Sequence, residues 1–160
     1  MRLVVLPVGR LKAGPERELA ERYCERAEKA GRAIGVKTVD VIEIDESRAR
    51  RPSERRSVEG AALKAAVPKD AVIVVLDGSG QALSSEAFAS RLGRWRDAGR
   101  AAVCFIIGGA DGLDPNVCKN ADFTLSFGAA TWPHQLVRIM LFEQLYRAVT
   151  ILCGHPYHRS

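Results

Sequence analysis

The chain has 160 residues, enough for one domain with a single hydrophobic core and too few for a sizeable second one. Hydrophobic residues make up 47 % and charged residues 27 %, a composition that excludes a largely disordered chain. The formal net charge of +5 favours polyanionic partners such as nucleic acid, with an enzyme of basic surface as the alternative.

Cysteine spacing and hydropathy exclude several other classes. The apolar run in "MRLVVLPVGRLKAG" is too short for a signal peptide, and no charge-free apolar stretch reaches membrane-spanning length. No C-x-x-C motif occurs, so neither a zinc ribbon nor a thioredoxin-like site is indicated. His155 and His158 have metal-ligand spacing but no third ligand near them. We therefore expect a cytoplasmic protein without a metal site and without a membrane partner.

Three elements are predicted in the first 45 residues. Residues 2–9 form an apolar run typical of a buried strand, and charged residues at helical spacing predict a helix over 15–33. Apolar and polar residues alternate over 36–45, which predicts a strand with one wet face or an edge position. The side chains expected inward are Val39, Val41 and Ile42 or Ile44, and those expected outward are Asp40, Glu43 and Asp45.

Five arginines crowd into nine positions just before a helix that is predicted to end near Val67. We call this set the arginine cluster; its members are Arg48, Arg50, Arg51, Arg55 and Arg56. One interpretation is a solvated loop or helix entrance. The other is a patch that contacts phosphate, because the planar guanidinium group matches phosphate oxygens.

The second half of the chain repeats a strand followed by small residues, at 71–80, 101–112 and 122–131. Between these strands, Ser84 caps a helix that has an acidic first turn, and Asp114 caps a short one. Strand–helix alternation with continuous apolar strands predicts an α/β fold in one domain, residues 1–160. The sheet should be mostly parallel, with helices on both of its faces.

Three loops follow these strands: "DGSG" (77–80), "GGADG" (108–112) and "FGAATW" (127–132). The carboxyl ends of parallel strands meet at one edge of a sheet, so the loops predict a pocket built from backbone groups. The phosphate-loop motif, the dinucleotide fingerprint and the nucleophile elbow are all absent. A small ligand with an adenine and few phosphates fits this pattern better than a nucleoside triphosphate.

The last predicted helix, "WPHQLVRIMLFEQLYRAVTILC" (132–153), is apolar around its whole circumference. Such a helix is buried on more than one side, and we expect a second copy of the chain to provide part of the cover, as a C2 dimer. Its charged exceptions, Glu143 and Arg147, are four residues apart and able to pair. They form either a surface ion pair or part of a site.

The segments "IGGADGL", "LSFGAATWPHQLVRIMLFEQLYRA" and the terminal "HPYHR" resemble the ribosomal RNA large subunit methyltransferase H family of the SPOUT superfamily. The resemblance implies a SPOUT fold with a C-terminal trefoil knot, a homodimer, and S-adenosyl-L-methionine as cofactor. The implied reaction is methylation of N3 of pseudouridine 1915 in 23S rRNA within the assembled 70S ribosome. For such an enzyme we expect the arginine cluster to contact ribosomal RNA.

Matching positions carry the family's site residues onto this chain. The cofactor residues would be Leu76, Gly108, Phe127, Gly128, Ala129, Ala130, Thr131 and Trp132. The substrate and catalytic residues would be Glu143, Arg147, Tyr157, His158 and Arg159. Our own hypothesis makes His158 the general base, since its ordinary pKa is near neutrality. Tyr157 would stack on or hydrogen-bond the target base, and Arg159 would hold phosphate or stabilise the imide anion.

Two alternatives stay open at this point. One is a SPOUT methyltransferase for another RNA, such as a transfer RNA. The other is a ribosome-binding module or assembly factor without catalysis. The sequence also leaves open which subunit of a dimer supplies the C-terminal tail to each active site.

Overall fold

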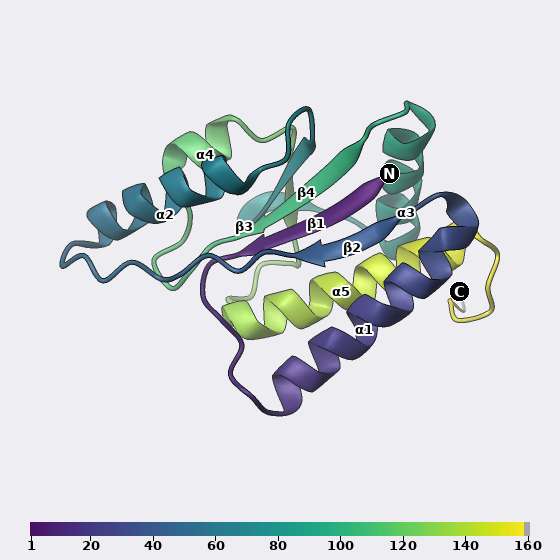
Figure 1. Ribbon diagram of the computed structural model, residues 1–160, viewed down its shortest axis with the longest axis horizontal. Coiled ribbons are helices and arrows are strands. Elements are labelled where there is room, and N and C mark those ends of the chain that lie inside the picture. Colours follow the sequence, from purple (N-terminus) through teal and green to yellow (C-terminus); the bar gives the residue numbers. More distant parts are fainter. Residues whose placement is uncertain (159–160) are drawn as a thin grey trace.

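The computed structural model describes residues 1–158, and its centre is a five-stranded sheet (Figure 1). The strands are β1 (Arg2–Pro7), β2 (Thr38–Val41), β3 (Val72–Ala82), β4 (Ala102–Ile107) and β5 (Phe123–Ser126). Their order is β2-β1-β4-β3-β5, and every neighbouring pair is parallel. The predicted α/β class is therefore confirmed, with a sheet that is parallel throughout. The trefoil knot stays a prediction.

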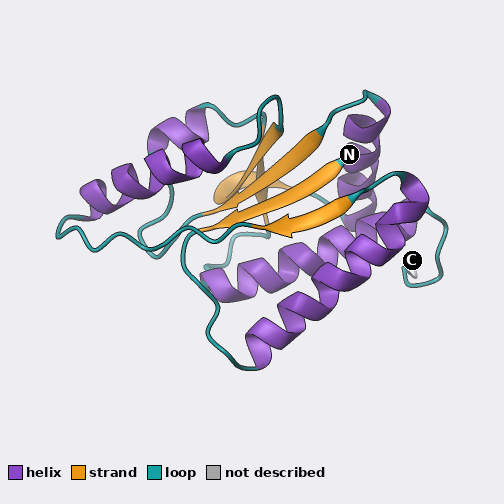
Figure 2. Cartoon of the chain, in the orientation of Figure 1, coloured by secondary structure: helices purple, strands orange, loops and turns teal. Residues whose placement is uncertain are grey.

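Helices cover both faces of the sheet, as predicted (Figures 1 and 2). One face packs against α1 (Pro15–Gly31), α3 (Ser85–Asp97) and α5 (His134–Leu152), and the other against α2 (Pro52–Ala66) and α4 (Pro115–Lys119). A short 3₁₀ helix, η1 (Arg32–Ile34), follows α1. Within residues 1–158, no helix is both long and apolar enough to cross a membrane.

The central strands are continuously apolar because both of their faces are buried. In β1, Leu3 and Val5 belong to the core beneath α1, α3 and α5. Val4 and Leu6 point the other way and pack in a second core with Leu63 of α2. Side chains thus alternate along each strand between the two cores. A shift of one residue in strand pairing would move each side chain to the opposite core, so this alternation specifies the register.

Strand β2 lies at the edge of the sheet, as one interpretation of its alternation predicted. Val39 is buried, but Val41 is 41 % exposed, so the prediction that Val41 points inward is wrong. Of the two alternatives Ile42 and Ile44, Ile42 is 40 % exposed, and Ile44 is partly buried against the second core. The reason is that the strand ends at Val41 and the chain then leaves the pleated sheet. Ile44 returns to it through a single parallel bridge to Val8.

Strand β3 continues beyond the point where the sequence predicted a turn. Its register against β5 shifts between Leu76 and Gln81, both of which pair with Leu125. Residues 77–80 therefore bulge out at the carboxyl end of the strand. A Cβ on Gly80 would lie 2.7 Å from the Thr124 carbonyl group, so this bulge requires glycine there.

Helix α5 obtains most of its cover from its own chain. It packs between α1 and α3 against the sheet, where Leu141, Phe142, Leu145 and Val149 are buried. Its first turns are less covered, and Leu136 is 40 % exposed. The apolar circumference is thus explained largely within one chain, and the dimer expected from it stays a prediction.

Candidate active site

The three strand-end loops meet at one cavity of about 670 Å³ at the carboxyl ends of β3, β4 and β5. All eight residues predicted to hold a cofactor line it: Leu76, Gly108, Phe127, Gly128, Ala129, Ala130, Thr131 and Trp132. Its size and apolar walls are those of a small-molecule site. The backbone pocket expected from three separate loops is therefore present as a single cavity.

A residue that the sequence analysis missed ties two of these loops together. The Ser126 hydroxyl lies within hydrogen-bond distance of the carbonyl oxygens of Gly78 (3.4 Å) and Gly128 (3.1 Å). It also accepts a hydrogen bond of 3.1 Å from the backbone N–H of Gly128. Gly128 has a φ of +102°, a conformation that favours glycine. The wall of the cavity is thus held by local contacts around the end of β5.

A second group of polar side chains gathers where the C-terminal tail folds back on α5. Glu143 is its centre: Oε1 accepts from Nε (2.9 Å) and Nη2 of Arg147 and from the Tyr157 hydroxyl (3.1 Å). The side chains of Arg147 and Glu143 are 26 % and 18 % exposed, so they are not a solvated surface pair. We call Glu143, Arg147, Tyr157 and His158 the tail cluster; the predicted Arg159 lies outside the described residues.

Both ring nitrogens of His158 make polar contacts, one of them to the tail cluster and the other to α3. Nε2 lies 2.7 Å from Oε1 of Glu86, and Nδ1 lies 3.4 Å from Nη1 of Arg147. A guanidinium group only donates, so a neutral ring that makes both contacts carries its proton on Nε2 and accepts at Nδ1. The backbone N–H of Glu86, the Ser84 hydroxyl and His158 lower the pKa of the Glu86 carboxyl.

Glu86 was predicted only as an acidic residue in the first turn of a helix. Its contact with His158 spans 72 positions in sequence, and no local pattern signals such a pairing. The contact depends on α5 and the tail passing beside the start of α3. It is therefore a product of tertiary structure.

Tyr157 packs inside the tail cluster. Its ring centroid lies 4.5 Å from that of Tyr146, and the Arg147 guanidinium carbon lies 4.9 Å from the Tyr157 centroid. Burial raises the pKa of the Tyr157 phenol, and the neighbouring Tyr23 hydroxyl and Glu143 carboxylate raise it further. The phenol is therefore protonated at neutral pH and able to donate to Glu143.

A groove of about 630 Å³ connects the cavity with the tail cluster. It shares Leu125, Ser126, Phe127 and Gly128 with the cavity, and Glu143 lines it as well. The cavity has no arginine or lysine among its described lining residues, and the tail cluster has several ionisable groups. The two regions therefore differ in chemistry: small residues form much of the cavity, and ionisable side chains form the tail cluster.

The family model described as "Predicted SPOUT methyltransferase" matches residues 1–158 of this chain. The chain belongs to this family. "Ribosomal RNA large subunit methyltransferase H" of Rhodopseudomonas palustris (strain ATCC BAA-98 / CGA009) is 58 % identical over 160 residues and covers 100 % of both chains. The protein of the same name from Bradyrhizobium diazoefficiens is 56 % identical, again over 100 % of both chains. The resemblance seen in the sequence is thereby confirmed.

Among solved structures, a probable methylase family protein from Haemophilus influenzae Rd KW20 aligns with a TM-score of 0.49 and 10 % identity. The alignment covers 99 % of this chain and 70 % of that one. The SPOUT assignment rests on the family model and on the full-length relatives. No group of three or more metal-binding side chains is suitably placed within residues 1–158 of this SPOUT methyltransferase.

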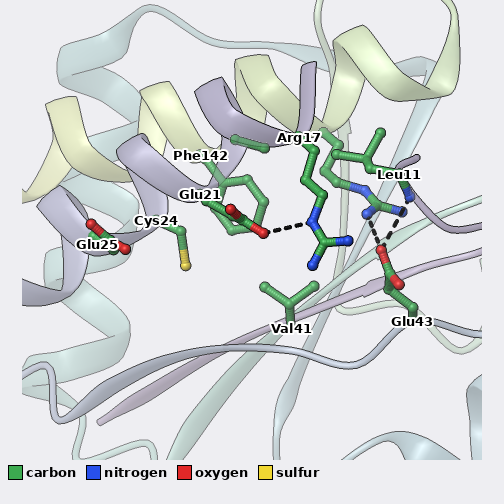
Figure 3. Close-up of a pocket in the computed structure, with 10 residues that line it drawn as sticks. Leu11, Arg17, Glu21, Cys24, Glu25, Val41, Glu43 and Phe142 are labelled. Atoms are coloured by element: carbon green, nitrogen blue, oxygen red, sulfur yellow. Dashed lines mark hydrogen bonds and ion pairs between the residues drawn. The ribbon is translucent and has the colours of Figure 1, made fainter. Parts of the chain in front are cut away.

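A smaller cavity of about 340 Å³ lies between α1, β2 and α5 (Figure 3). Arg138, only 3 % exposed, donates to Oε1 of Glu43 and to the carbonyl oxygen of Gly9 (2.7 Å). Glu43 is exposed, as predicted, and its carboxylate also neutralises this buried guanidinium group. Arg138 fastens the first half of α5 to the chain that leaves β1.

We predict that one of the three tyrosines of this methyltransferase, Tyr157, ionises well above the ordinary pKa of a phenol. Glu143→Gln removes a negative charge beside it and should lower its pKa. The measurement is an ultraviolet absorbance titration of tyrosinate, with Glu21→Gln, which breaks a separate helical pair with Arg17, as the control.

The same shift has a defined effect on stability. The pKa of Tyr157 is higher in the folded protein than in the unfolded chain. Its proton-linked contribution to the free energy of unfolding is therefore present at neutral pH and is lost as the pH rises through the folded-state pKa. A titration in which all three tyrosines ionise together near the ordinary value would contradict this prediction.

Proposed function

We propose that this SPOUT methyltransferase transfers the methyl group of S-adenosylmethionine to N3 of pseudouridine 1915 in 23S rRNA, on the assembled ribosome. The observation that carries the proposal is the similarity over the whole chain to curated proteins named ribosomal RNA large subunit methyltransferase H, at 56 % and 58 % identity. The net charge of +5 agrees with an RNA substrate. Action on ribosomes implies a cytoplasmic location.

The strand-end cavity has the chemistry that this cofactor requires. Its walls are mostly apolar side chains and backbone groups, and its described lining includes no arginine or lysine for phosphate. That suits an adenosine group joined to a positively charged sulfonium centre without phosphates. Leu76, Gly108 and residues 127–132 would hold it, and the bound cofactor would supply an electrophilic methyl group.

The tail cluster supplies the proton chemistry of the proposed reaction. N3 of pseudouridine must lose a proton to become a nucleophile, and Nδ1 of a neutral His158 is an acceptor for that proton. To take it, Nδ1 exchanges its contact with Arg147 for one with the substrate. The Glu86 carboxylate, 2.7 Å from Nε2, then stabilises the imidazolium ion that forms.

The remaining residues of the tail cluster position the substrate. Glu143 holds the Arg147 guanidinium group from one side and the Tyr157 hydroxyl from another, which fixes both beside His158. The Tyr157 ring would stack on the target base, and Arg159 would hold phosphate or stabilise the imide anion. Holding two reactants in line is a large part of catalysis in a displacement reaction.

We also infer a homodimer in which the tail of one protomer faces the cofactor cavity of the other. Val137 lines the cavity and Arg147 belongs to the tail cluster, and they lie ten positions apart in α5, or about 15 Å along the helix axis. That separation is long for a single displacement step. Trp132 and Leu136, 43 % and 40 % exposed beside the cavity, are suitable contacts for a second copy.

The proposed substrate is tested by offering S-adenosylmethionine with 70S ribosomes, free 23S RNA or transfer RNA. We expect methylation of 70S ribosomes at the pseudouridine, and faster than that of free 23S RNA. Preferential methylation of transfer RNA would assign a different RNA. Absence of both methylation and cofactor binding would leave a ribosome-binding module.

The proposed base is tested with His158→Ala in single-turnover methylation across a range of pH. We expect the rate to fall by about 10²–10⁴-fold, with loss of the rise that follows deprotonation of the imidazole. His155→Asn is the matched control, since asparagine keeps an acceptor for the Tyr157 N–H that His155 Nδ1 now binds. An unchanged rate and pH profile in His158→Ala would rule this base out.

The proposed dimer is tested by complementation between two inactive variants. Ala130→Trp fills the cofactor cavity, and His158→Ala removes the base. Heterodimers of the two variants are purified by a different tag on each chain. If the tail acts on the partner's cavity, one of the two sites combines an intact cavity with an intact tail, and about half of the wild-type activity should return. If each tail serves its own chain, the heterodimer stays inactive.

A further inference from the structure

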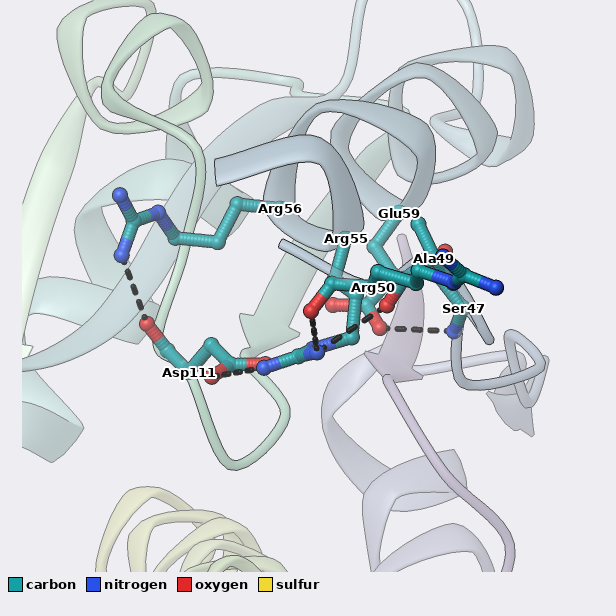
Figure 4. A network of polar contacts seen from close by, with 7 residues as sticks. All are labelled: Ser47, Ala49, Arg50, Arg55, Arg56, Glu59 and Asp111. Atoms are coloured by element: carbon teal, nitrogen blue, oxygen red, sulfur yellow. Dashed lines mark hydrogen bonds and ion pairs between the residues drawn. The ribbon is translucent and has the colours of Figure 1, made fainter. Parts of the chain in front are cut away.

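The arginine cluster divides into two parts in the folded chain; Figure 4 shows three of its members, Arg50, Arg55 and Arg56. Arg48, Arg50 and Arg51 are exposed and free of close contacts with the glycine loop, which we define as residues 108–112. Arg55 and Arg56, at the start of α2, are partly buried and reach that loop instead. The second part therefore has an internal role.

Arg55 binds Asp111 through a two-pronged ion pair. Nε donates to Oδ2 at 2.6 Å and Nη2 donates to Oδ1 at 2.9 Å, with the side chains 27 % and 24 % exposed. Hydrogen bonding to Arg55 lowers the pKa of the Asp111 carboxyl, and the same contact raises the pKa of the guanidinium group. Both groups are charged at neutral pH, and their planar geometries match.

The same guanidinium group also holds the segment before α2. Nη1 of Arg55 donates to the carbonyl oxygens of Ala49 (3.0 Å) and Arg50 (3.1 Å). The buried Glu59 fixes this segment again, because its Oε1 accepts a hydrogen bond of 2.8 Å from the Ser47 N–H. Arg55 thus joins α2, residues 47–51 and the glycine loop at one point.

The glycine loop has one side chain that can serve as an anchor. Asp111 is its only residue with more than a methyl group, and it is absent from the cavity lining that includes its neighbours Ala110 and Gly112. The turn is tight, since the Gly112 N–H donates to the Gly109 carbonyl oxygen at 3.0 Å. Asp111 therefore points away from the cavity and ties the loop to α2 (Figure 4).

We propose that Arg55 and Asp111 are a positioning pair, which holds the glycine loop in the shape that receives the cofactor. Neither side chain touches the cavity. They act through Ala110 and Gly112, which line it. The inference rests on the proposed function in so far as the ligand is S-adenosylmethionine.

The test compares Arg55→Gln and Asp111→Asn with the intact protein in calorimetric titrations with S-adenosylmethionine. We expect an increase of about tenfold in Kd and in the KM for the cofactor, with kcat at saturating cofactor close to wild type. The double variant Arg55→Asp/Asp111→Arg should recover part of the affinity. Arg2→Gln is the matched control, because it breaks a similar pair with Asp40 (2.9 Å) at the amino ends of β1 and β2.

Hydrogen exchange at the amides of residues 108–112 provides a readout that needs no cofactor. Exchange should be faster in Arg55→Gln and Asp111→Asn than in wild type or Arg2→Gln. Unchanged exchange in the two variants would overturn the positioning role. Provided that the wild type binds the cofactor, faster exchange in variants whose cofactor Kd is unchanged would overturn it too. Failure of the wild-type protein to bind S-adenosylmethionine would instead overturn the proposed function, and exchange would still decide whether the pair holds the loop.

Discussion

The whole arrangement depends on a parallel sheet that is buried on both faces. Parallel pairing sends every strand in the same direction, so the chain must cross back over a face of the sheet between strands. Two helical layers result, and the loops that leave β3, β4 and β5 meet at one edge. The cavity is therefore a direct product of the strand directions.

The proposed mechanism separates ligand binding from proton transfer. The cavity is formed mainly by small residues and backbone groups, as in the stretch 127–132, whereas the ionisable side chains come from α5, the start of α3 and the tail. Glu143 connects these parts, because it lines the groove beside the cavity and binds both Arg147 and Tyr157.

Two arginines fasten loops near the site through contacts distant in sequence. Arg138, almost fully buried, binds Glu43 and the Gly9 carbonyl group across 95 and 129 positions. Arg55 spans 56 positions to reach Asp111. Loops rich in glycine have high conformational entropy when free, and charged contacts to such a loop reduce it. The positive charge of the chain thus serves its internal architecture as well as attraction to nucleic acid.

The sequence by itself determined the elements of the fold. Continuous apolar strands, helix caps at Ser84 and Asp114, and small residues after three strands are local signals, and they predicted the sheet, its two helical layers and the backbone pocket. Family motifs then indicated the eight cavity residues and the tail. Tertiary structure alone decided the pairing of His158 with Glu86, of Arg55 with Asp111 and of Arg138 with Glu43, and it exposed Val41 where alternation predicted burial. Side-chain periodicity reports only which face of its own element a residue occupies, whereas partners from distant segments are set by how the layers pack.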